Sequence, residues 1–472
     1  MTVNPLRSLS LVSLSALALA GCAVGPDYAR SSPRPALSGP FLAVGTPPVT
    51  ASPLPADWWR LYDDPVLNGL VEQALAANTD VRQAMARIER ARAGLRGAGA
   101  ARLPQGSVSA SGSYARQAES QSASGADRQG WSYDGGIQIG YEVDLFGRIG
   151  RGVEAARADL AASQADADAV RVMVIADTTR AYADAAAGAA QVKVAQEIVA
   201  LLDQSLELTQ RRHDAGLENG LALAQIRTLR EQRAAEIPAL EAARQAALFR
   251  LATLTGQAPA DLPAVAGERS LALEIGAPIP VGNGADLLAR RPDIRAAERR
   301  LAAQTARIGV ATADLYPSIT LGAAVGQTGT DLGDLLTGGP LRWLLGPLLS
   351  WNINQEPARA RIAAAEAGTQ EALAAFDGTM LVALEETETA LSTYARALER
   401  RSALQAASAQ AERAARITRA QAREGAINSL VRLDAERTLA ESRAQLAQQD
   451  ATVSRAQIDL FRALGGGWSS RQ

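Results

Sequence analysis

The sequence predicts an α+β membrane protein in which each chain contributes four short strands to a shared β-barrel and long helices to a helical tube. Three observations predict this class. A strand pattern runs directly into a helix of unusual length, the same succession of elements occurs twice, and the N-terminus carries an export signal. A chain with so few strands needs further copies to close a barrel in a bilayer.

The N-terminus resembles a bacterial lipoprotein signal. Arg7 precedes an apolar run at residues 9–20 that is too short to cross a bilayer as a helix. The run ends in a sequence that resembles a lipobox, after which the signal is removed and the cysteine becomes the acylated first residue. Its residues are Leu19, Ala20, Gly21 and Cys22. Cys22 is the single cysteine of the chain, and the alternative is a buried structural cysteine beside a plain secretion signal.

The first strand-to-helix transition lies near residue 146. From Ile137 to Leu145 apolar residues hold the odd positions and polar or small residues the even ones, the pattern of a strand with unlike faces. Residues 148–213 then contain no Pro, and good helix formers dominate. At about 1.5 Å per residue this helix would be on the order of 100 Å long. Small and apolar residues recur in it every seven positions, as in a seam between packed helices.

The second half of the chain repeats the first. Asp80 corresponds to Asp293 and Pro104 to Pro317, and both pairs give the same shift, 293 − 80 = 213 and 317 − 104 = 213. We therefore expect the same elements in both halves. The expected order is a signal peptide at 1–21, an acylated N-terminus and Pro-rich tether at 22–56, a first repeat at 57–256, a linker at 257–284, a second repeat at 285–466 and a tail at 467–472. The expected strands are about 107–115, 131–146, 318–327 and 343–354, and the expected long helices are 148–213 and 358–424.

Aromatic residues gather in the two strand–loop–strand segments, which suits a membrane barrel with aromatic girdles. They are Tyr114, Trp131, Tyr133, Tyr141, Phe146, Tyr316, Trp343 and Trp351. A soluble sandwich is the alternative. In a bilayer four strands cannot close, two chains would give a barrel filled by side chains, and three would give twelve strands with room for water. The expected inward positions are polar and mostly small, so we predict a homotrimer with an open lumen. Candidate lumen residues are Ser107, Ser109, Ser111, Ser113, Gln138, Glu142, Asp144, Ser318 and Thr320.

Composition excludes several function classes. The chain has 48 basic and 50 acidic residues, so it lacks the basic excess of a nucleic-acid binder. One His and one Cys are too few for a metal centre or a Cys/His catalytic pair. Acidic residues are spread along helices, and no Ser/His/Asp or phosphate-loop signature stands out. We expect no enzyme activity, no metal and no cofactor.

Several motifs across the mature chain resemble one family, the OprM/NodT branch of the TolC-like outer-membrane efflux proteins. The motifs are Cys22–Tyr28, Asp57–Trp59, Glu142–Arg148, Leu287–Glu298, Ile308–Ala311, Tyr316–Ile319 and Leu433–Arg437. The resemblance implies a homotrimer with a twelve-stranded outer-membrane barrel and a periplasmic α-barrel. It implies a periplasmic adaptor and an inner-membrane pump, commonly of the resistance-nodulation-division class, as partners. The chain itself would be a passive exit duct for drugs or other small toxic solutes, lipid-anchored in the outer membrane.

Two other readings stay open beside the efflux duct. One is the outer-membrane exit of a type I protein-secretion system, which would share the fold. The other is a periplasmic coiled-coil lipoprotein without a pore.

The sequence departs from the family pattern at two places. Relatives often carry Gly-Val-Asp-Asn at the periplasmic helix tip, where acidic side chains ring a closed aperture. Here the stretch is Gly425-Ala426-Ile427-Asn428, so we expect a hydrophobic constriction at Ile427 with Asn428 or Glu424 nearby. The second departure is residues 354–357, Asn-Gln-Glu-Pro, where relatives usually show Phe-Asp-Gly-Gly-Arg. We expect a different local junction between strand and helix there.

Overall fold

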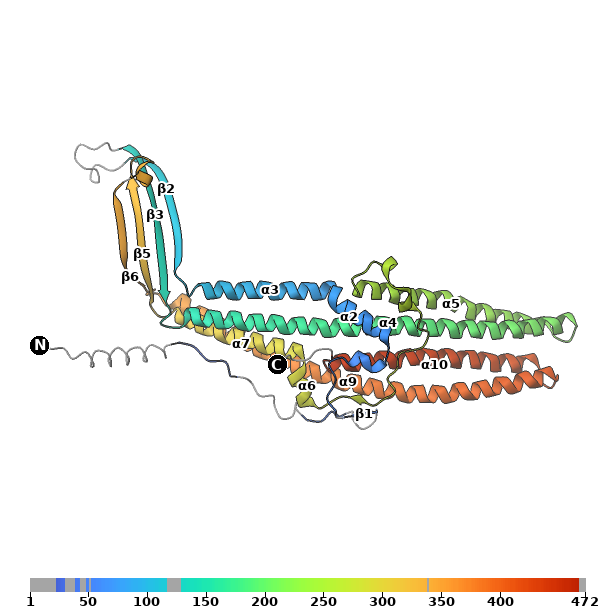
Figure 1. Ribbon diagram of the computed structural model, residues 1–472. Helices are drawn as coiled ribbons and strands as arrows, with labels where there is room; N and C mark the ends of the chain where they lie inside the picture. Colours follow the sequence, from blue (N-terminus) through green and yellow to red (C-terminus); the bar gives the residue numbers. More distant parts are fainter. Residues whose placement is uncertain are drawn as a thin grey trace. The chain divides into compact units, whose positions relative to one another are not determined.

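A computed structural model describes residues 23–29, 39–42, 48–50, 52–116, 129–337 and 339–466 (Figure 1). The predicted cleavage and lipidation residues, Leu19, Ala20, Gly21 and Cys22, lie outside the described residues. The chain divides into two compact units. The strand unit comprises residues 1–31, 87–163 and 296–376, and the helical unit comprises residues 32–86, 164–295 and 377–472.

The strand unit holds a four-stranded antiparallel sheet in the order β2-β3-β5-β6. Its strands are β2 Gln105–Arg116, β3 Gln129–Val143, β5 Ser318–Gly329 and β6 Leu341–Ser350. A short helix, α8 Asp334–Thr337, lies in the β5–β6 connection. Each repeat therefore contributes one adjacent pair of strands, at the places in the chain that the alternating pattern predicts.

Two of the predicted strand ends are wrong. The second strand was expected to reach residue 146 but ends at Val143, and the fourth was expected to reach residue 354 but ends at Ser350. The cause at the first junction is Asp144, whose carboxylate accepts hydrogen bonds from the backbone N–H groups of Ile149 at 2.9 Å and Gly150 at 2.6 Å. Those N–H groups belong to the first turn of a helix, so Asp144 acts as its N-terminal cap.

Helices account for most of the chain. The first repeat contains α2 Pro65–Ala77, α3 Thr79–Ala100, α4 Arg148–Asp214 and α5 Gly220–Leu254. The second contains α6 Gly284–Arg290, α7 Pro292–Ala313, α9 Glu356–Arg423 and α10 Ser429–Ala463. The two long helices have 67 and 68 residues, so each is on the order of 100 Å long, as expected.

Short elements complete the helical unit. The 3₁₀ helices are η3 Trp58–Tyr62, η5 Pro259–Asp261 and η6 Ala264–Gly267. A two-residue strand, β1 Val49–Thr50, pairs in parallel with β4 Ile279–Pro280. The chain preceding the first repeat and the linker between the repeats therefore meet in this small sheet.

The core of the helical unit combines small side chains with a few large ones. Ala181, Ala183 and Ala186 of α4 are each at most 4% exposed, which lets neighbouring backbones approach closely. The largest anchor is Trp58, which is fully buried and stacks on Phe461 of α10 with ring centroids 4.5 Å apart. Trp58 therefore anchors the start of the first repeat in the core of the helical unit.

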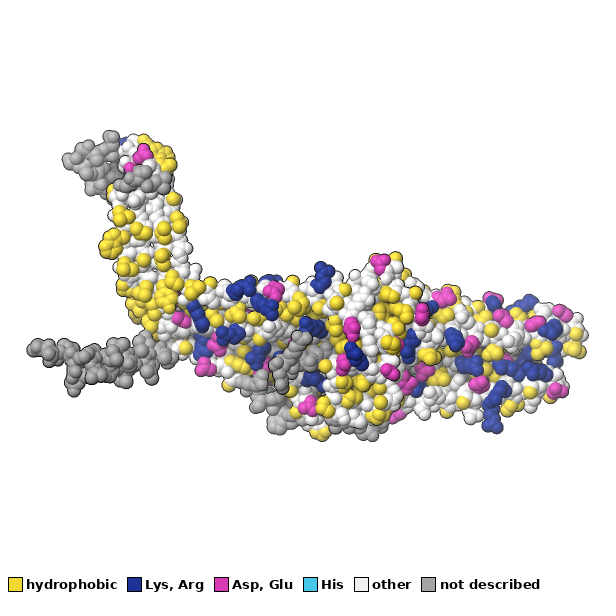
Figure 2. Space-filling model, in the orientation of Figure 1, with side chains coloured by type: hydrophobic (Ala, Val, Ile, Leu, Met, Phe, Trp, Pro, Cys, Tyr) yellow, Lys and Arg dark blue, Asp and Glu magenta, His cyan; other side chains and the backbone are white. Residues whose placement is uncertain are grey.

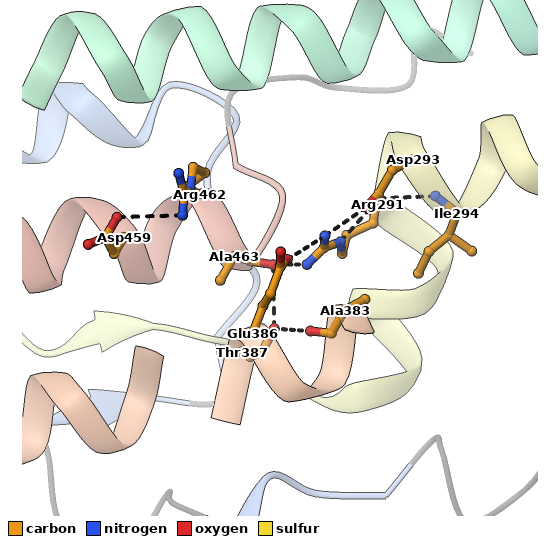
Figure 3. Close-up of polar contacts among 9 residues, drawn as sticks. All are labelled: Arg291, Asp293, Ile294, Ala383, Glu386, Thr387, Asp459, Arg462 and Ala463. Atoms are coloured by element: carbon orange, nitrogen blue, oxygen red, sulfur yellow. Dashed lines mark hydrogen bonds and ion pairs between the residues drawn. The ribbon is translucent and has the colours of Figure 1, made fainter. Parts of the chain in front are cut away.

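A matching junction occurs in both repeats. In the first, the Asn78 side chain donates to the Leu254 carbonyl, the last residue of α5, at 2.9 Å. In the second, Arg291 donates to the Ala463 carbonyl at the end of α10 at 2.9 Å, and it also binds Asp293 and Glu386, both at 2.7 Å (Figure 3). Positions 78 and 291 share the 213-residue shift, so the duplication extends from sequence to this contact, with an amide in one half and a guanidinium in the other.

Candidate channel wall and helix tips

The register of the sheet separates polar from apolar side chains. In an antiparallel pair, residues directly opposite each other point to the same face. Ser111 lies opposite Asp134, Asp134 opposite Thr328, and Glu142 opposite Thr320. Following such pairs across all four strands defines the polar face of the sheet. Its members are Gln105, Ser107, Ser109, Ser111, Ser113, Ala115, Gly130, Ser132, Asp134, Gly136, Gln138, Gly140, Glu142, Ser318, Thr320, Gly322, Ala324, Gly326, Thr328, Arg342, Leu344, Gly346, Leu348 and Ser350.

The opposite face, here called the apolar face, is largely hydrophobic and uncovered. Val108 is 80% exposed, Trp343 74% and Leu345 76%. In Figure 2 hydrophobic side chains lie over the sheet, and few charged ones appear between its two ends. Its large apolar members are Val108, Tyr114, Trp131, Tyr133, Ile137, Ile139, Tyr141, Val143, Ile319, Leu321, Val325, Leu341, Trp343, Leu345 and Leu349. So much exposed apolar surface indicates a partner or a membrane.

Aromatic rings lie at the hairpin end of the apolar face and beyond the helix end of the sheet. At the hairpin end, Trp131 stacks on Tyr133 with centroids 5.7 Å apart and lies 5.5 Å from Tyr114. At the helix end, beyond the strands, Phe146 stacks on Tyr316 at 4.5 Å. Two aromatic levels with aliphatic side chains between them are typical of a strand that crosses a bilayer.

Most predicted lumen residues fall on the polar face. Ser109, Ser111, Gln138, Glu142 and Thr320 all lie there, and so do Ser107, Ser113 and Ser318. Asp144 does not, because it lies beyond the end of β3 and caps α4. The placement of Asp144 in the barrel wall is therefore wrong.

Charged residues of the polar face form ion pairs. Glu142 accepts from Arg148 Nε at 2.9 Å and Nη2 at 2.6 Å, a two-point contact. Asp134 accepts from Arg342 Nη2 at 2.5 Å. Sequence reasoning missed Asp134 and Arg342. Asp134 shares the even numbering of Gln138 and Glu142, so extending the strand pattern toward the hairpin would have found it.

The predicted aperture residues lie at the turn between α9 and α10, in the helical unit. Gly425 has φ +72°, which favours glycine, and its counterpart Gly216 between α4 and α5 has φ +70°. The Asn428 side chain caps α10 by accepting from the Val431 N–H at 3.0 Å, as Asn219 does for α5 through Ala222. Ile427 is half-buried and Glu424 is exposed.

Arginines tie the two helix hairpins together near these turns. Arg432 of α10 is 5% exposed and donates to Thr209 Oγ1 at 2.6 Å and to the Ser205 carbonyl of α4 at 3.3 Å. Burial lowers the pKa of Arg432 from its ordinary value, and Glu436 acts in the opposite direction. Arg212 of α4 donates to the Ala422 carbonyl of α9 at 3.1 Å. Side-chain hydrogen bonds therefore join α4 to both α9 and α10 near the α9–α10 turn.

Comparison with known proteins adds the family. The family model described as "Outer membrane efflux protein" matches residues 70–257 and 284–466, one segment in each repeat. "Outer membrane protein OprJ" of Pseudomonas aeruginosa is 32% identical over 459 residues, covering 96% of this chain and 95% of the relative. "Nodulation protein T" of Rhizobium leguminosarum bv. trifolii is 30% identical over 457 residues and covers 96% of both chains.

A solved structure agrees with these relatives. The outer-membrane channel OprN superposes with a TM-score of 0.87 at 35% identity, covering 95% of this chain and 100% of that one. The predicted TolC-like fold and its internal duplication are confirmed. The family is one of channels and not of enzymes. With its two-faced sheet, its paired helix hairpins and a match in both repeats, the chain belongs to the outer membrane efflux protein family and is an outer-membrane efflux channel of the OprM/NodT type.

Proposed function

We propose that three copies of this chain form a passive exit duct across the outer membrane, with the polar face of the sheet lining the lumen and the apolar face against lipid. The observation that carries this proposal is the two-faced sheet with two open edges. Among the described strands, β2 and β6 each pair on one side only. Their free N–H and C=O groups would have no water to bond within a bilayer, so the edges must pair with further copies.

The dimensions of the sheet support a barrel of twelve strands. The strands have 12, 15, 12 and 10 residues, and a tilted strand needs about 9–11 residues to cross the hydrocarbon core. Two copies would give eight strands and a filled interior, whereas three leave room for water. Serine, glycine and threonine along the polar face suit a wet lumen.

The apolar character of the helices is explained by packing within the protein and not by contact with the membrane. Among the described helices only α4 is long and apolar enough, by composition, to cross a bilayer, but half of its most apolar window is buried inside the chain. Packing within a helical tube explains this apolarity. We place the helical unit in the periplasm, where such helices from three chains would form a tube.

A passive duct needs an energy source elsewhere, so we propose an inner-membrane pump, of the resistance-nodulation-division class, and a periplasmic adaptor as partners. The transported solutes would be drugs or other small toxic molecules delivered by the pump. At the periplasmic end we propose that Ile427 forms a hydrophobic constriction, with Glu424 and Asn428 beside it. High conductance of the purified trimer without an adaptor would contradict a closed constriction.

We also propose that Cys22 anchors the mature N-terminus to the outer membrane through a lipid. The lipobox-like Leu19-Ala20-Gly21-Cys22 and the absence of any other cysteine in the sequence support this assignment. Replacing Cys22 by Ser should abolish metabolic labelling with radioactive palmitate. Unchanged labelling would refute the lipoprotein assignment.

The exit duct is tested with the full-length chain purified from outer membranes. Native mass spectrometry should give three chains per particle, and the particles should form water-filled pores in planar lipid bilayers once the constriction is opened by replacing Ile427 with Ser. A stable monomer or dimer, or particles that insert without conducting in the Ile427→Ser variant, would rule the proposal out.

A further inference from the structure

The geometry points to Arg342 as the residue that controls the ionic selectivity of the barrel, because it neutralises Asp134 on the polar face. The inference rests on the proposed function, since it requires the polar face to line a conducting pore. It assigns a role to two residues near the hairpin end of the sheet.

The pair joins three strands. Arg342 in β6 donates from Nη2 to Asp134 Oδ1 in β3 at 2.5 Å, and Thr328 in β5 donates from Oγ1 to Asp134 Oδ2 at 3.0 Å. Both carboxylate oxygens are therefore occupied. The Arg342 side chain remains 60% exposed and that of Asp134 32%, so ions in a wet lumen would reach both groups.

A gap in the side-chain layer gives the arginine its path. Arg342 lies opposite Gly326, and Gly326 lies opposite Gly136, so no side chain stands between β6 and β3 at this level. The backbones are also close, because a Cβ atom at Gly326 would lie 2.6 Å from the Gly135 carbonyl oxygen. The long guanidinium side chain can thus cross a whole strand to reach its partner.

Asp134 and Arg342 are the charged strand residues at the hairpin end of the polar face. Among the described strand residues of that face, the charged ones are Asp134, Glu142 and Arg342. Glu142 is held by Arg148, which lies beyond the strand at the start of α4. Asp134 and Glu142 are 142 − 134 = 8 residues apart on β3, roughly 27 Å. Between them the face is neutral, so losing Arg342 would expose one acidic group per chain with no other charge nearby on the face.

In a trimer the unpaired groups would form a ring of three like charges. Charges about 10 Å from the conducting path act on permeant ions across water, and the effect is screened by salt with a Debye length of about 10 Å at 0.1 M. We expect Arg342→Gln to raise the ratio of cation to anion permeability by about two- to fourfold at 0.1 M salt. The shift should grow at 0.01 M and nearly vanish at 1 M.

The experiment measures reversal potentials of the full-length trimer in planar bilayers under a KCl gradient, with every variant in the Ile427→Ser background. Arg342→Gln should shift the potential toward the K⁺ equilibrium value, and Asp134→Asn should shift it toward the Cl⁻ value. The double variant should return to the parent value. Arg342→Lys, which keeps the charge, should leave the selectivity unchanged.

Arg116→Gln is the matched control. Arg116 ends β2 at the same end of the sheet but belongs to the opposite face, since it pairs with Gln129 in the register of Tyr114 and Trp131. The Arg116→Gln substitution removes the same charge on the face away from the lumen, so the reversal potential should stay at the parent value. Equal potentials for the Arg342→Gln, Asp134→Asn and parent channels would overturn this inference alone. A parent that never conducts would overturn the proposed function, and the inference with it.

Discussion

At the scale of single residues, the α9–α10 turn shows how one position can decide whether a duct is closed. Gly425 adopts the positive φ that the turn requires, and the Asn428 side chain caps α10. Local backbone geometry therefore explains both residue types. Ile427 has no such local task, and it is half-buried between exposed Ala426 and Asn428. Arg432 and Arg212 fix the turn against α4, which would hold Ile427 in place.

We predict that Ile427→Ser raises the single-channel conductance of the purified trimer several-fold. A hydroxyl in place of a branched apolar chain would let water fill a constriction that the isoleucines keep dry. Leu430→Ser is the control, because Leu430 is an exposed apolar residue in the first turn of α10. Bilayer recordings in which both variants conduct, but no better than the wild type, would remove Ile427 from the aperture.

At the scale of elements, the backbones of the two central strands of the sheet, β3 and β5, approach each other closely at a pair of glycines. Gly136 of β3 and Gly326 of β5 lie opposite each other. A Cβ atom at Gly136 would lie 2.9 Å from the Val325 carbonyl oxygen, and one at Gly326 would lie 2.6 Å from that of Gly135. Neither backbone can move aside without breaking the hydrogen bonds between β3 and β5. The pairing of the first repeat with the second therefore requires glycine at both positions.

We predict that Gly326→Ala destabilises the assembled barrel by about 1–3 kcal/mol per chain, the usual cost of forcing a methyl group into a packed site. Gly346→Ala should be nearly neutral, because Gly346 lies on the same face in β6 with open space around its would-be Cβ atom. The temperature at which the trimer dissociates on denaturing gels reports the difference. Equal dissociation temperatures would show that the sheet relaxes around the methyl group.

The same elements show what sequence reasoning could and could not reach. Period-two alternation located all four strands, and helix propensity located both long helices, because each signal is local. The end of β3 was missed because Asp144 continues the alternation while its carboxylate caps α4. The Asp134–Arg342 pair depends on the register of β6 against β5 and of β5 against β3, and residues 208 apart in the chain carry no local sign of contact.

At the scale of the whole molecule, the duplication explains why one chain supplies an even set of strands and helices. Each repeat gives two strands and one helix of about 100 Å. In the first repeat, Asn78 before α3 binds the end of α5, and in the second, Arg291 before α7 binds the end of α10. Within the described residues of one chain, the four-stranded sheet still has two open edges. A membrane duct therefore has to be an assembly, with lipid on one face of the sheet and water on the other.

This central claim is tested most directly by placing one charge on either face of β6. Leu344 and Leu345 are neighbours of the same residue type near the middle of the strand, but the register puts Leu344 on the polar face and Leu345 on the apolar face. Arginine facing lipid at the bilayer centre costs about 2–4 kcal/mol, whereas a wet lumen accepts it. The measurement is the amount of heat-modifiable trimer in isolated outer membranes. We predict near wild-type amounts for Leu344→Arg and a severe loss for Leu345→Arg; equal amounts, or the reverse order, would contradict the account.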